Sequence, residues 1–285
     1  MKKFITTTYT VKSNRLKRNP LVFLMISDLH NVVFGKDNQV LFDAMRAEHP
    51  DLILIAGDLV LGKKGAPLKP ALDFLKEAIK IAPICYEPGN HEQRMEDDTE
   101  KYGTVFEKYR KEIESRGIVY LSNQRVQVRV KGEKLGITGL ALPYSYYKKG
   151  KVQPPELQEL EEKIGKPSED AFEILLAHTP RFGNTYFEWG ADLILSGHYH
   201  GGMMRLPKFG SVISPDFRLF PSYGCGLYEK DSKGRKNVAD TVENPVSTPV
   251  MITGAGLGEH TLPIRIHNPR ELICIRCIPE GIAKV

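Results

Sequence analysis

Five apolar runs of strand-like composition are spread along this chain, and each is followed at once by polar residues. The runs occupy residues 22–26, 52–56, 84–86, 174–177 and 193–195. Segments with helical spacing of apolar residues separate the first three runs, at 38–48 and 68–78. This alternation predicts a largely parallel sheet with helices on its faces. Because ligands gather outside the carboxyl ends of parallel strands, the polar residues after the runs are predicted to meet at one place.

The polar residues at these strand ends offer oxygen and nitrogen donors and no thiolate. The seven donors are Asp28, His30, Asp58, Asn90, His178, His198 and His200. Two pairs, 28 with 30 and 198 with 200, are spaced two apart, so in extended backbone the members of each pair point to one side. Taken singly, such motifs are more often surface polarity or satisfied core groups. Five of them in order predict a metal centre, and this donor set suits Mn, Fe or Zn better than copper.

The pattern changes after residue 117. Strands are predicted at 125–130, 134–140, 250–253, 263–266 and 272–278, helices at 99–115 and 156–164, and a polar loop at 231–249. Two packed sheets with helices outside fit this mixture better than one doubly wound sheet. The predicted fold class is therefore α/β, a four-layer α/β/β/α sandwich of two mixed β-sheets flanked by helices. One domain over residues 1–285 is predicted, with a basic N-terminal arm at 1–19.

The charge balance argues against some classes of protein. Lys and Arg outnumber Asp and Glu by 40 to 35, a net charge of +5 that is too small to predict nucleic-acid binding. The sequence has no leader-like apolar segment and no run long enough to span a bilayer. We therefore expect a soluble chain, cytoplasmic or peripheral to a membrane, although an upstream anchor outside this sequence would leave the same residues. Contact between these basic residues and an anionic membrane is the alternative to a solvated edge strand or arm.

The four cysteines do not predict a disulfide framework. Cys274 and Cys277 formally match a C-x-x-C pattern. They lie in a predicted strand, where residues three apart face opposite sides. Both are therefore predicted to be packing residues.

Taken in order, these motifs resemble those of a known family, the calcineurin-like metallophosphoesterases. The family pattern D-x-H, GD, GNH[ED], H and GHxH is met at residues 28–30, 57–58, 89–92, 178 and 197–200. Further segments, at 27–31, 34–36, 50–51, 200–202 with 205–207, and 263–266 with 268–269, are similar to the bacterial YkuE/YaeI-type branch. The resemblance implies the metallophosphoesterase fold and two divalent metal ions, Mn²⁺, Fe²⁺/Fe³⁺ or Zn²⁺.

The resemblance also implies a role for each residue. One ion would be held by Asp28, His30, Asp58 and His200, and the other by Asp58, Asn90, His178 and His198, with Asp58 as the bridge. His91 would contact the phosphate and aid the leaving group, so Asp58 and His91 are the predicted catalytic residues. Asn90, His91 and Arg94 are the predicted substrate-binding residues, with Arg205 and Arg265 as weaker candidates. We also expect Glu92 to orient the His91 imidazole, with a helix cap as the alternative role.

The predicted function is hydrolysis of a phosphodiester or pyrophosphate by in-line attack of a metal-bridging hydroxide. The substrate is expected to be a phosphorylated small molecule or a lipid-linked one, such as the UDP-sugar lipid UDP-2,3-diacylglucosamine that a relative cleaves. Alternatives on the same site are a phosphomonoesterase, a nuclease or a cyclic-nucleotide phosphodiesterase. A non-catalytic binding module is less favoured because all the family residues are present. Aromatic residues at 144–147 and at Phe217, Phe220, Tyr223 and Tyr228 are candidates for a substrate rim.

Overall fold

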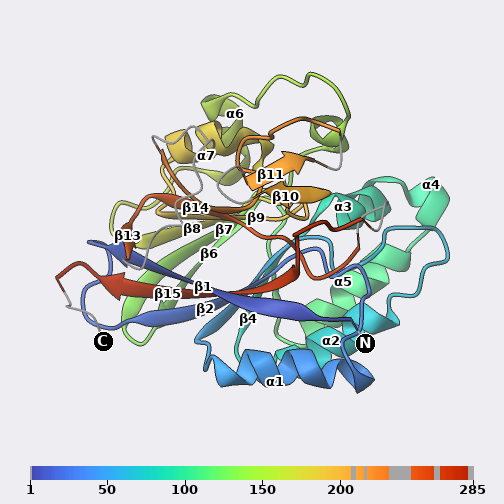
Figure 1. The fold of residues 1–285 in the computed structure, drawn as a ribbon, viewed down its shortest axis with the longest axis horizontal. Helices are drawn as coiled ribbons and strands as arrows, with labels where there is room; N and C mark the ends of the chain where they lie inside the picture. Colours follow the sequence, from blue (N-terminus) through green and yellow to red (C-terminus); the bar gives the residue numbers. More distant parts are fainter. Residues whose placement is uncertain (1, 207–209, 215–216, 231–244, 260–263, 282–285) are drawn as a thin grey trace.

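The computed structural model describes residues 2–206, 210–214, 217–230, 245–259 and 264–281, and it shows two β-sheets face to face with helices outside them (Figure 1). The strands of the first sheet are β1 (Phe4–Ser13), β2 (Leu21–Ile26), β3 (Leu52–Ala56), β4 (Ile84–Glu87), β5 (Val119–Tyr120), β13 (Val246–Ser247) and β15 (Arg270–Pro279). Their order is β13-β1-β15-β2-β3-β4-β5. The C-terminal strand β15 lies between β1 and β2, parallel to β1 and antiparallel to β2.

The second sheet is also mixed. It contains β6 (Gln124–Val130), β7 (Glu133–Gly139), β8 (Phe172–Leu176), β9 (Leu193–Ser196), β12 (Gly226–Glu229) and β14 (Val250–Thr253). The order is β12-β14-β9-β8-β7-β6, with four central parallel strands and an antiparallel strand at each edge. A separate antiparallel pair, β10 (Met204–Leu206) and β11 (Gly210–Ile213), follows β9.

Helices complete the outer layers of the sandwich. α1 (Gln39–Ala47), α2 (Lys69–Ala78) and α5 (Val105–Ser115) cover the first sheet, α6 (Leu157–Ile164) and α7 (Gly183–Trp189) cover the second, and α3 (Asn90–Asp97) and α4 (Thr99–Tyr102) lie at one end. Short 3-10 helices occur at Lys36–Asn38, Tyr144–Tyr147 and Pro180–Phe182. The predicted four-layer fold is confirmed. No helix in the described ranges combines the length and the apolar composition needed to cross a membrane.

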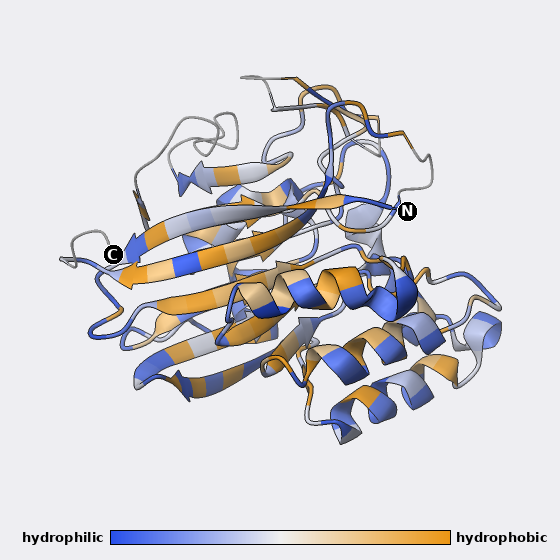
Figure 2. Ribbon diagram, turned by 60° about the horizontal axis from the view of Figure 1, so that its bottom comes forward, coloured by the Kyte–Doolittle hydropathy of each residue, from blue (hydrophilic) through white to orange (hydrophobic). Residues whose placement is uncertain are grey.

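Three apolar layers fill the spaces between these elements. Ile53 and Ile55 of β3 pack toward α1 and α2, whereas Leu52 and Leu54 pack between the two sheets. A third layer joins the second sheet to α6 and α7. Strands buried on both faces consist of nearly continuous apolar residues. Figure 2 colours long stretches of the strands orange, the colour of hydrophobic residues. This burial explains why the strands could be predicted from their composition.

The C-x-x-C pattern is a packing feature, as predicted. Cys274 lies in the layer between the first sheet and its helices, and Cys277 lies in the layer between the sheets. All four cysteines are buried free thiols.

Most of the segment for which an edge strand or an arm was predicted is a strand, β1, next to the edge of the first sheet. Residues 4–13 form β1, which pairs with β15 from Phe4 to Ser13. The segment alternates threonines with apolar residues, and Tyr9 and Val11 are buried between the sheets. Alternation of this kind is typical of a strand with one buried face. The basic residues in this part of the sequence led instead to the expectation of a solvated segment.

Three further predictions need correction or fall partly outside the described residues. The helix predicted at 99–115 is two helices, because Gly103 has a φ of 61° and ends α4 before α5 begins. Of the strand predicted at 263–266, residue 263 is not described and the rest forms a single bridge, from Ile266 to Met204. Of the loop predicted at 231–249, residues 231–244 are not described, and β13 lies within the remainder.

Candidate metal centre

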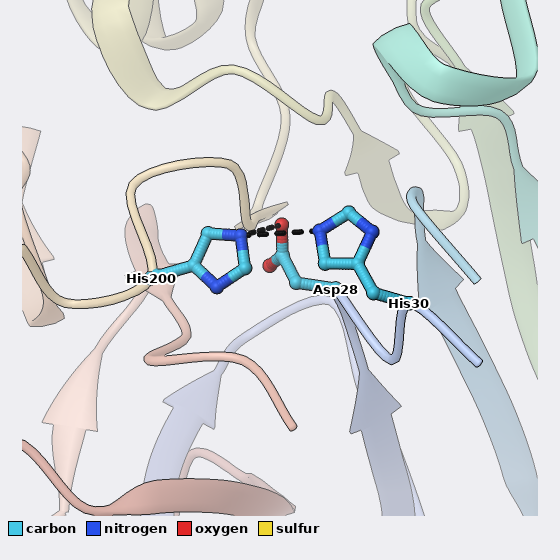
Figure 3. Close-up of side chains that lie close together, drawn as sticks. All are labelled: Asp28, His30 and His200. Atoms are coloured by element: carbon cyan, nitrogen blue, oxygen red, sulfur yellow. Dashed lines mark hydrogen bonds and ion pairs between the residues drawn. The ribbon is translucent and has the colours of Figure 1, made fainter. Parts of the chain in front are cut away.

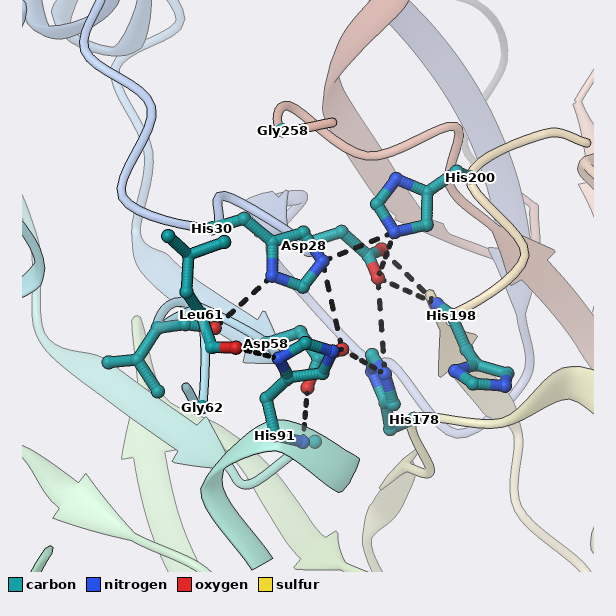
Figure 4. Close-up of polar contacts among 12 residues, drawn as sticks. Asp28, His30, Asp58, Leu61, Gly62, His91, His178, His198, His200 and Gly258 are labelled. Carbon is teal, nitrogen blue, oxygen red and sulfur yellow. Dashed lines mark hydrogen bonds and ion pairs between the residues drawn. The ribbon is translucent and has the colours of Figure 1, made fainter. Parts of the chain in front are cut away.

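The loops after β2, β3, β4, β8 and β9 meet at one end of the sandwich (Figure 4). Their backbones hold one another. The amide of Asp28 donates to the carbonyl of Gly57 at 3.0 Å, and the amide of Gly197 donates to the carbonyl of His178 at 2.9 Å. The amide of His198 donates to the Asp28 carboxylate at 3.0 Å, which joins the loops of the two sheets. The structure therefore brings all five predicted strand ends together.

The backbone at the donors is not extended, so the reason given for the paired spacing is wrong. Asp28, His30, Asp58, His198 and His200 have left-handed conformations, with φ between 47° and 64°. Each strand stops before the donors, and a tight bend then turns their side chains inward. Non-glycine residues in this conformation are costly and cluster at functional sites. Gly57 itself cannot be replaced by a larger residue, because a Cβ there would lie 2.4 Å from Nδ1 of the His178 ring.

Two groups of donors lie close enough to hold one ion each. They are Asp28 with His30 and His200, and Asp58 with His178 and His198. In the first group, His200 Nε2 lies 3.3 Å from Asp28 Oδ1 and 3.2 Å from His30 Nε2 (Figure 3). In the second, His178 Nε2 lies 3.1 Å from Asp58 Oδ2. Asp58 Oδ2 is also 3.8 Å from His30 Nε2, so this carboxylate faces both groups.

Backbone carbonyls fix the orientation of three imidazoles. The pairs are His30 Nδ1 with Val60 O at 3.1 Å, His178 Nδ1 with Ala56 O at 2.8 Å, and His91 Nδ1 with Leu61 O. A carbonyl oxygen only accepts, so each Nδ1 carries a hydrogen and each ring turns its Nε2 toward the centre. Imidazoles that bind metals are held in this way.

Burial and charge shift the pKa values of the central groups in different directions. Burial raises the pKa of Asp28 to about 6, although the neighbouring His178 opposes it. Burial acts in the same sense on Asp58, but His178 and His91 hold the pKa of Asp58 well below its ordinary value. Burial lowers the pKa of His30 to about 4. Desolvation also acts to lower the pKa of His178, but Asp58 outweighs it and raises that pKa to about 10.

These residues fit divalent cations. His178 Nε2 and Asp58 Oδ2 face each other at 3.1 Å, and this contact needs either a proton on Nε2, as in the metal-free ring, or a metal ion bound to both atoms. Asn90 Oδ1 is buried and meets no hydrogen-bond donor among the described residues. A buried oxygen of this kind is satisfied by a cation. The assignment of individual ligands to individual ions stays a prediction.

His91 is more exposed than His30 and His178, and His198 is likewise only partly buried. Its side chain is 23% exposed, against 4% for His30 and 0% for His178. Its amide, at the start of α3, donates to Asp58 Oδ1 at 2.9 Å, and its Nε2 lies 3.8 Å from Asp58 Oδ2. Geometry alone also groups it with His30 and Asp58 as ligands of one ion. Its place at the mouth of the centre fits the predicted contact with substrate.

Glu92 caps the start of α3, the second of its two predicted roles, and the His91 ring is oriented by the carbonyl of Leu61 instead. Its carboxylate accepts hydrogen bonds from the amides of Asp58, Val60 and Gly89 at 3.0 to 3.1 Å and from the hydroxyl of Tyr86 at 2.7 Å. Burial raises the pKa of Glu92 to about 7. The residue therefore shapes the loop that carries Asp58.

Arg265 and Asn268 hold the loop that carries His200. Nη2 of Arg265 donates to the carbonyls of Ala255 and Gly258 at 2.9 and 2.7 Å and lies 3.4 Å from His200 Nδ1. Nδ2 of Asn268 donates to the carbonyls of His200 and Gly202, both at 2.6 Å. Sequence reasoning considered Arg265 only as a phosphate contact and missed this role. In the sequence, only the resemblance of the segments at 263–266 and 268–269 to the YkuE/YaeI-type branch drew attention to this region.

The other predicted substrate contacts have mixed outcomes. Arg94 donates to the carbonyl of Gly62 at 3.0 Å, and its predicted role with substrate stays untested. Tyr223 and Tyr228 are buried in the layer under α7, so they do not form a rim. Tyr147 packs the edge of its ring against His198, with centroids 5.1 Å apart. Phe217 and Phe220 are exposed.

The sequence profile of the calcineurin-like phosphoesterase family matches residues 21–202, a segment that holds all seven donors and His91. The chain belongs to this family. It is therefore a metal-dependent phosphoester hydrolase, and divalent metal ions are its expected cofactors.

Three relatives of this phosphoesterase are bacterial. YpbG of Bacillus subtilis (strain 168) is 29% identical over 278 residues, which cover 96% of this chain and 88% of YpbG. The phosphodiesterase YaeI of Escherichia coli (strain K12) is 28% identical over 199 residues, 69% of this chain and 66% of YaeI. The metallophosphoesterase YkuE of B. subtilis is 25% identical over 238 residues, 80% of this chain and 74% of YkuE. The predicted resemblance to the YkuE/YaeI-type branch is confirmed.

Proposed function

We propose that this phosphoesterase hydrolyses a phosphodiester or a pyrophosphate. The proposal depends on one observation, the two donor groups that both face the carboxylate of Asp58. Divalent ions held by these two groups would supply a nucleophile at neutral pH and stabilise the charge that develops during an in-line displacement. The printed name of the relative YaeI, a phosphodiesterase, supports a diester.

The arginines that adjoin the centre support the same choice. A phosphomonoester carries up to two negative charges on its terminal group, and a diester carries one. Arg94 and Arg265 both donate to backbone carbonyls, with N–O distances of 2.7 to 3.0 Å. A guanidinium engaged in this way is not arranged as a bidentate clamp for a dianionic phosphoryl group. A substrate with less charge on phosphorus fits this environment better.

His91 is the residue that we assign to proton transfer. Its Nδ1–H donates to the carbonyl of Leu61, so Nε2, which faces the centre at 3.8 Å from Asp58 Oδ2, is the atom that exchanges a proton. A proton delivered from Nε2 to the departing oxygen would contribute roughly a hundredfold to ten-thousandfold in rate.

Hydrolysis of two aryl phosphates tests the proposed function. We expect the chain with Mn²⁺ to cleave bis-p-nitrophenyl phosphate with a higher kcat/KM than p-nitrophenyl phosphate. Chelation should stop both reactions, and parallel assays with Fe²⁺ and Zn²⁺ would identify the preferred ion. A preference for the monoester would contradict the proposal and favour the phosphomonoesterase alternative. Absence of both activities from metal-loaded protein would favour a binding module.

Substitution of His91 separates proton transfer from metal binding. We expect His91→Asn to keep the full metal content, measured by elemental analysis. For diphenyl phosphate, whose leaving group needs a proton, kcat should fall by roughly two to four orders of magnitude. The loss should be smaller for bis-p-nitrophenyl phosphate, which has a better leaving group. His49→Asn is the control, because His49 is an exposed histidine that belongs to neither donor group. Loss of metal, with equal effects on both substrates, would identify His91 as a ligand instead.

The finer predictions on substrate follow from the same assay. If the diester is preferred, a UDP-sugar lipid such as UDP-2,3-diacylglucosamine is one compound to test, together with smaller pyrophosphates. A nuclease or cyclic-nucleotide phosphodiesterase remains the alternative among diesterases, and the modest net charge of +5 gives it little support.

A further inference from the structure

Large apolar side chains are exposed beside the metal centre. Of the eleven large apolar residues exposed among the described ones, six belong to three segments that follow the His198–His200 loop in sequence. They are Leu206, Phe217, Leu219, Phe220, Ile264 and Ile266, which we call the apolar platform. The most prominent are Phe217, Leu219 and Phe220, with exposed fractions of 58%, 69% and 61%. Exposed apolar clusters of this kind mark interaction sites.

Backbone pairing places the platform on one small surface. β10 and β11 pair with each other, and each takes a further partner on its outer side. Leu219 forms a bridge with Ile213 of β11, and Ile266 forms a bridge with Met204 of β10. The platform residues therefore come from three segments, β10 and the stretches at 217–220 and 264–266, which the pairing with β10 and β11 brings together. β10 and β11 lie beyond the end of β9, on the side of the sandwich that holds the centre (Figure 1).

The platform borders the metal centre directly. β10 begins four residues after His200, and the two platform isoleucines flank Arg265 in sequence. The guanidinium of Arg265 in turn lies against His200 Nδ1, at 3.4 Å. Whatever binds the platform is thus held next to the mouth of the centre.

Most charged side chains that the structure describes near the platform are cationic, and an exception is Glu259, whose Oε2 lies 4.0 Å from Nε of Arg265. Within residues 203–206, 210–214 and 217–223 the charged residues are Arg205 and Arg218. Lys149 adds a third cation, with Nζ 4.9 Å from the centroid of the Phe217 ring. Apolar side chains that project beside cations are typical of surfaces that enter the interface of an anionic bilayer, because the cations meet the lipid phosphates. A protein partner would instead need a pocket for each projecting side chain.

We propose that the apolar platform inserts into the surface of an anionic lipid bilayer and turns the metal centre toward the head groups. The substrate class is then a phosphoester carried by a membrane lipid or a lipid-linked molecule. The choice of substrate rests on the proposed function, but the docking does not, since it needs no turnover.

Vesicle binding tests the docking. We would measure co-sedimentation of the full chain with vesicles of phosphatidylglycerol and phosphatidylcholine, in the presence of chelator. The triple variant Phe217→Ser, Leu219→Ser, Phe220→Ser should bind at least about tenfold more weakly than the unaltered chain, since three projecting apolar groups are lost. The control is Val40→Ser with Val105→Ser, two exposed valines on α1 and α5. The control should bind like the unaltered chain, and circular dichroism should confirm that both variants fold.

Three outcomes would overturn the proposal. One is failure of the unaltered chain to bind anionic vesicles at low salt. Another is equal binding by the triple variant. The last is a dimer of the unaltered chain that the triple variant loses in sedimentation velocity without lipid, which would make the platform a contact between two copies. Because binding is measured without metal, inactivity on diesters would refute the proposed function and leave this result standing.

Discussion

Asp58→Asn is expected to lower kcat/KM for bis-p-nitrophenyl phosphate by at least roughly a thousandfold, about 4 kcal/mol of transition-state stabilisation. The substitution keeps the shape of the side chain, and its Oδ1 still accepts the hydrogen bond from the His91 amide. It replaces the charged Oδ2, which faces His178 at 3.1 Å and His30 at 3.8 Å, with a donor. Both donor groups then lose the anion that they share.

Asp51→Asn is the matched control for this experiment. Asp51 precedes β3 and Asp58 follows it, so the two aspartates lie at opposite ends of one strand. The Asp51 carboxylate accepts from the amide of Val22 and from Lys131, far from the centre. We expect this variant to keep its activity and its metal content. Unchanged turnover by Asp58→Asn would show that the reaction does not use the centre described above.

Removal of metal is expected to destabilise the folded chain strongly. The two donor groups together contain two carboxylates and four imidazoles. Bound ions compensate for the hydration that these groups lose on burial. An ion at a thousandfold excess over its Kd adds about 4 kcal/mol to the free energy of unfolding, which corresponds to roughly 10 °C in Tm. We would compare thermal unfolding after chelation with unfolding after Mn²⁺ is restored. Asp58→Asn should show a much smaller difference, and a difference of equal size would contradict the assignment of the centre.

The same experiment has a dependence on pH whose direction follows from His178. With its pKa raised to about 10, the metal-free ring is protonated at pH 8, whereas His30, lowered to about 4, is already neutral. Metal must displace the His178 proton, so apparent affinity should rise with pH until about pH 10. Calorimetry at pH 8 in buffers of different ionisation enthalpy should show release of about one proton per chain. Binding without proton release would indicate that His178 is not a ligand.

The residues that form the centre could be predicted because each follows a strand buried on both faces. In Leu52–Ala56 every residue is buried, so the run is continuous and its end is unambiguous. The carboxyl ends of neighbouring parallel strands meet, which places Asp28 and Asp58 together without further information.

The local geometry could not be predicted, because distant contacts determine it. The bend at Asp28 depends on a hydrogen bond to Gly57 across the sheet, and extended backbone was the expectation in its absence. Arg265 reaches His200 across 65 positions of sequence, and no local pattern shows that contact. Glu92 adjoins His91 in sequence but binds the loop after β3, so proximity along the chain was misleading.

The position of β15 has a consequence for how the chain is made. The first two strands are not neighbours, because the last strand fills the place between them. A chain leaving the ribosome therefore has to wait for its C-terminal residues before the first sheet can close, and until then β1 and β2 present open edges to other chains. The segment with Arg265 and Asn268 arrives just before that strand. Closure of the sheet and support of the His200 loop are thus both late events, and a nascent chain has no catalytic centre.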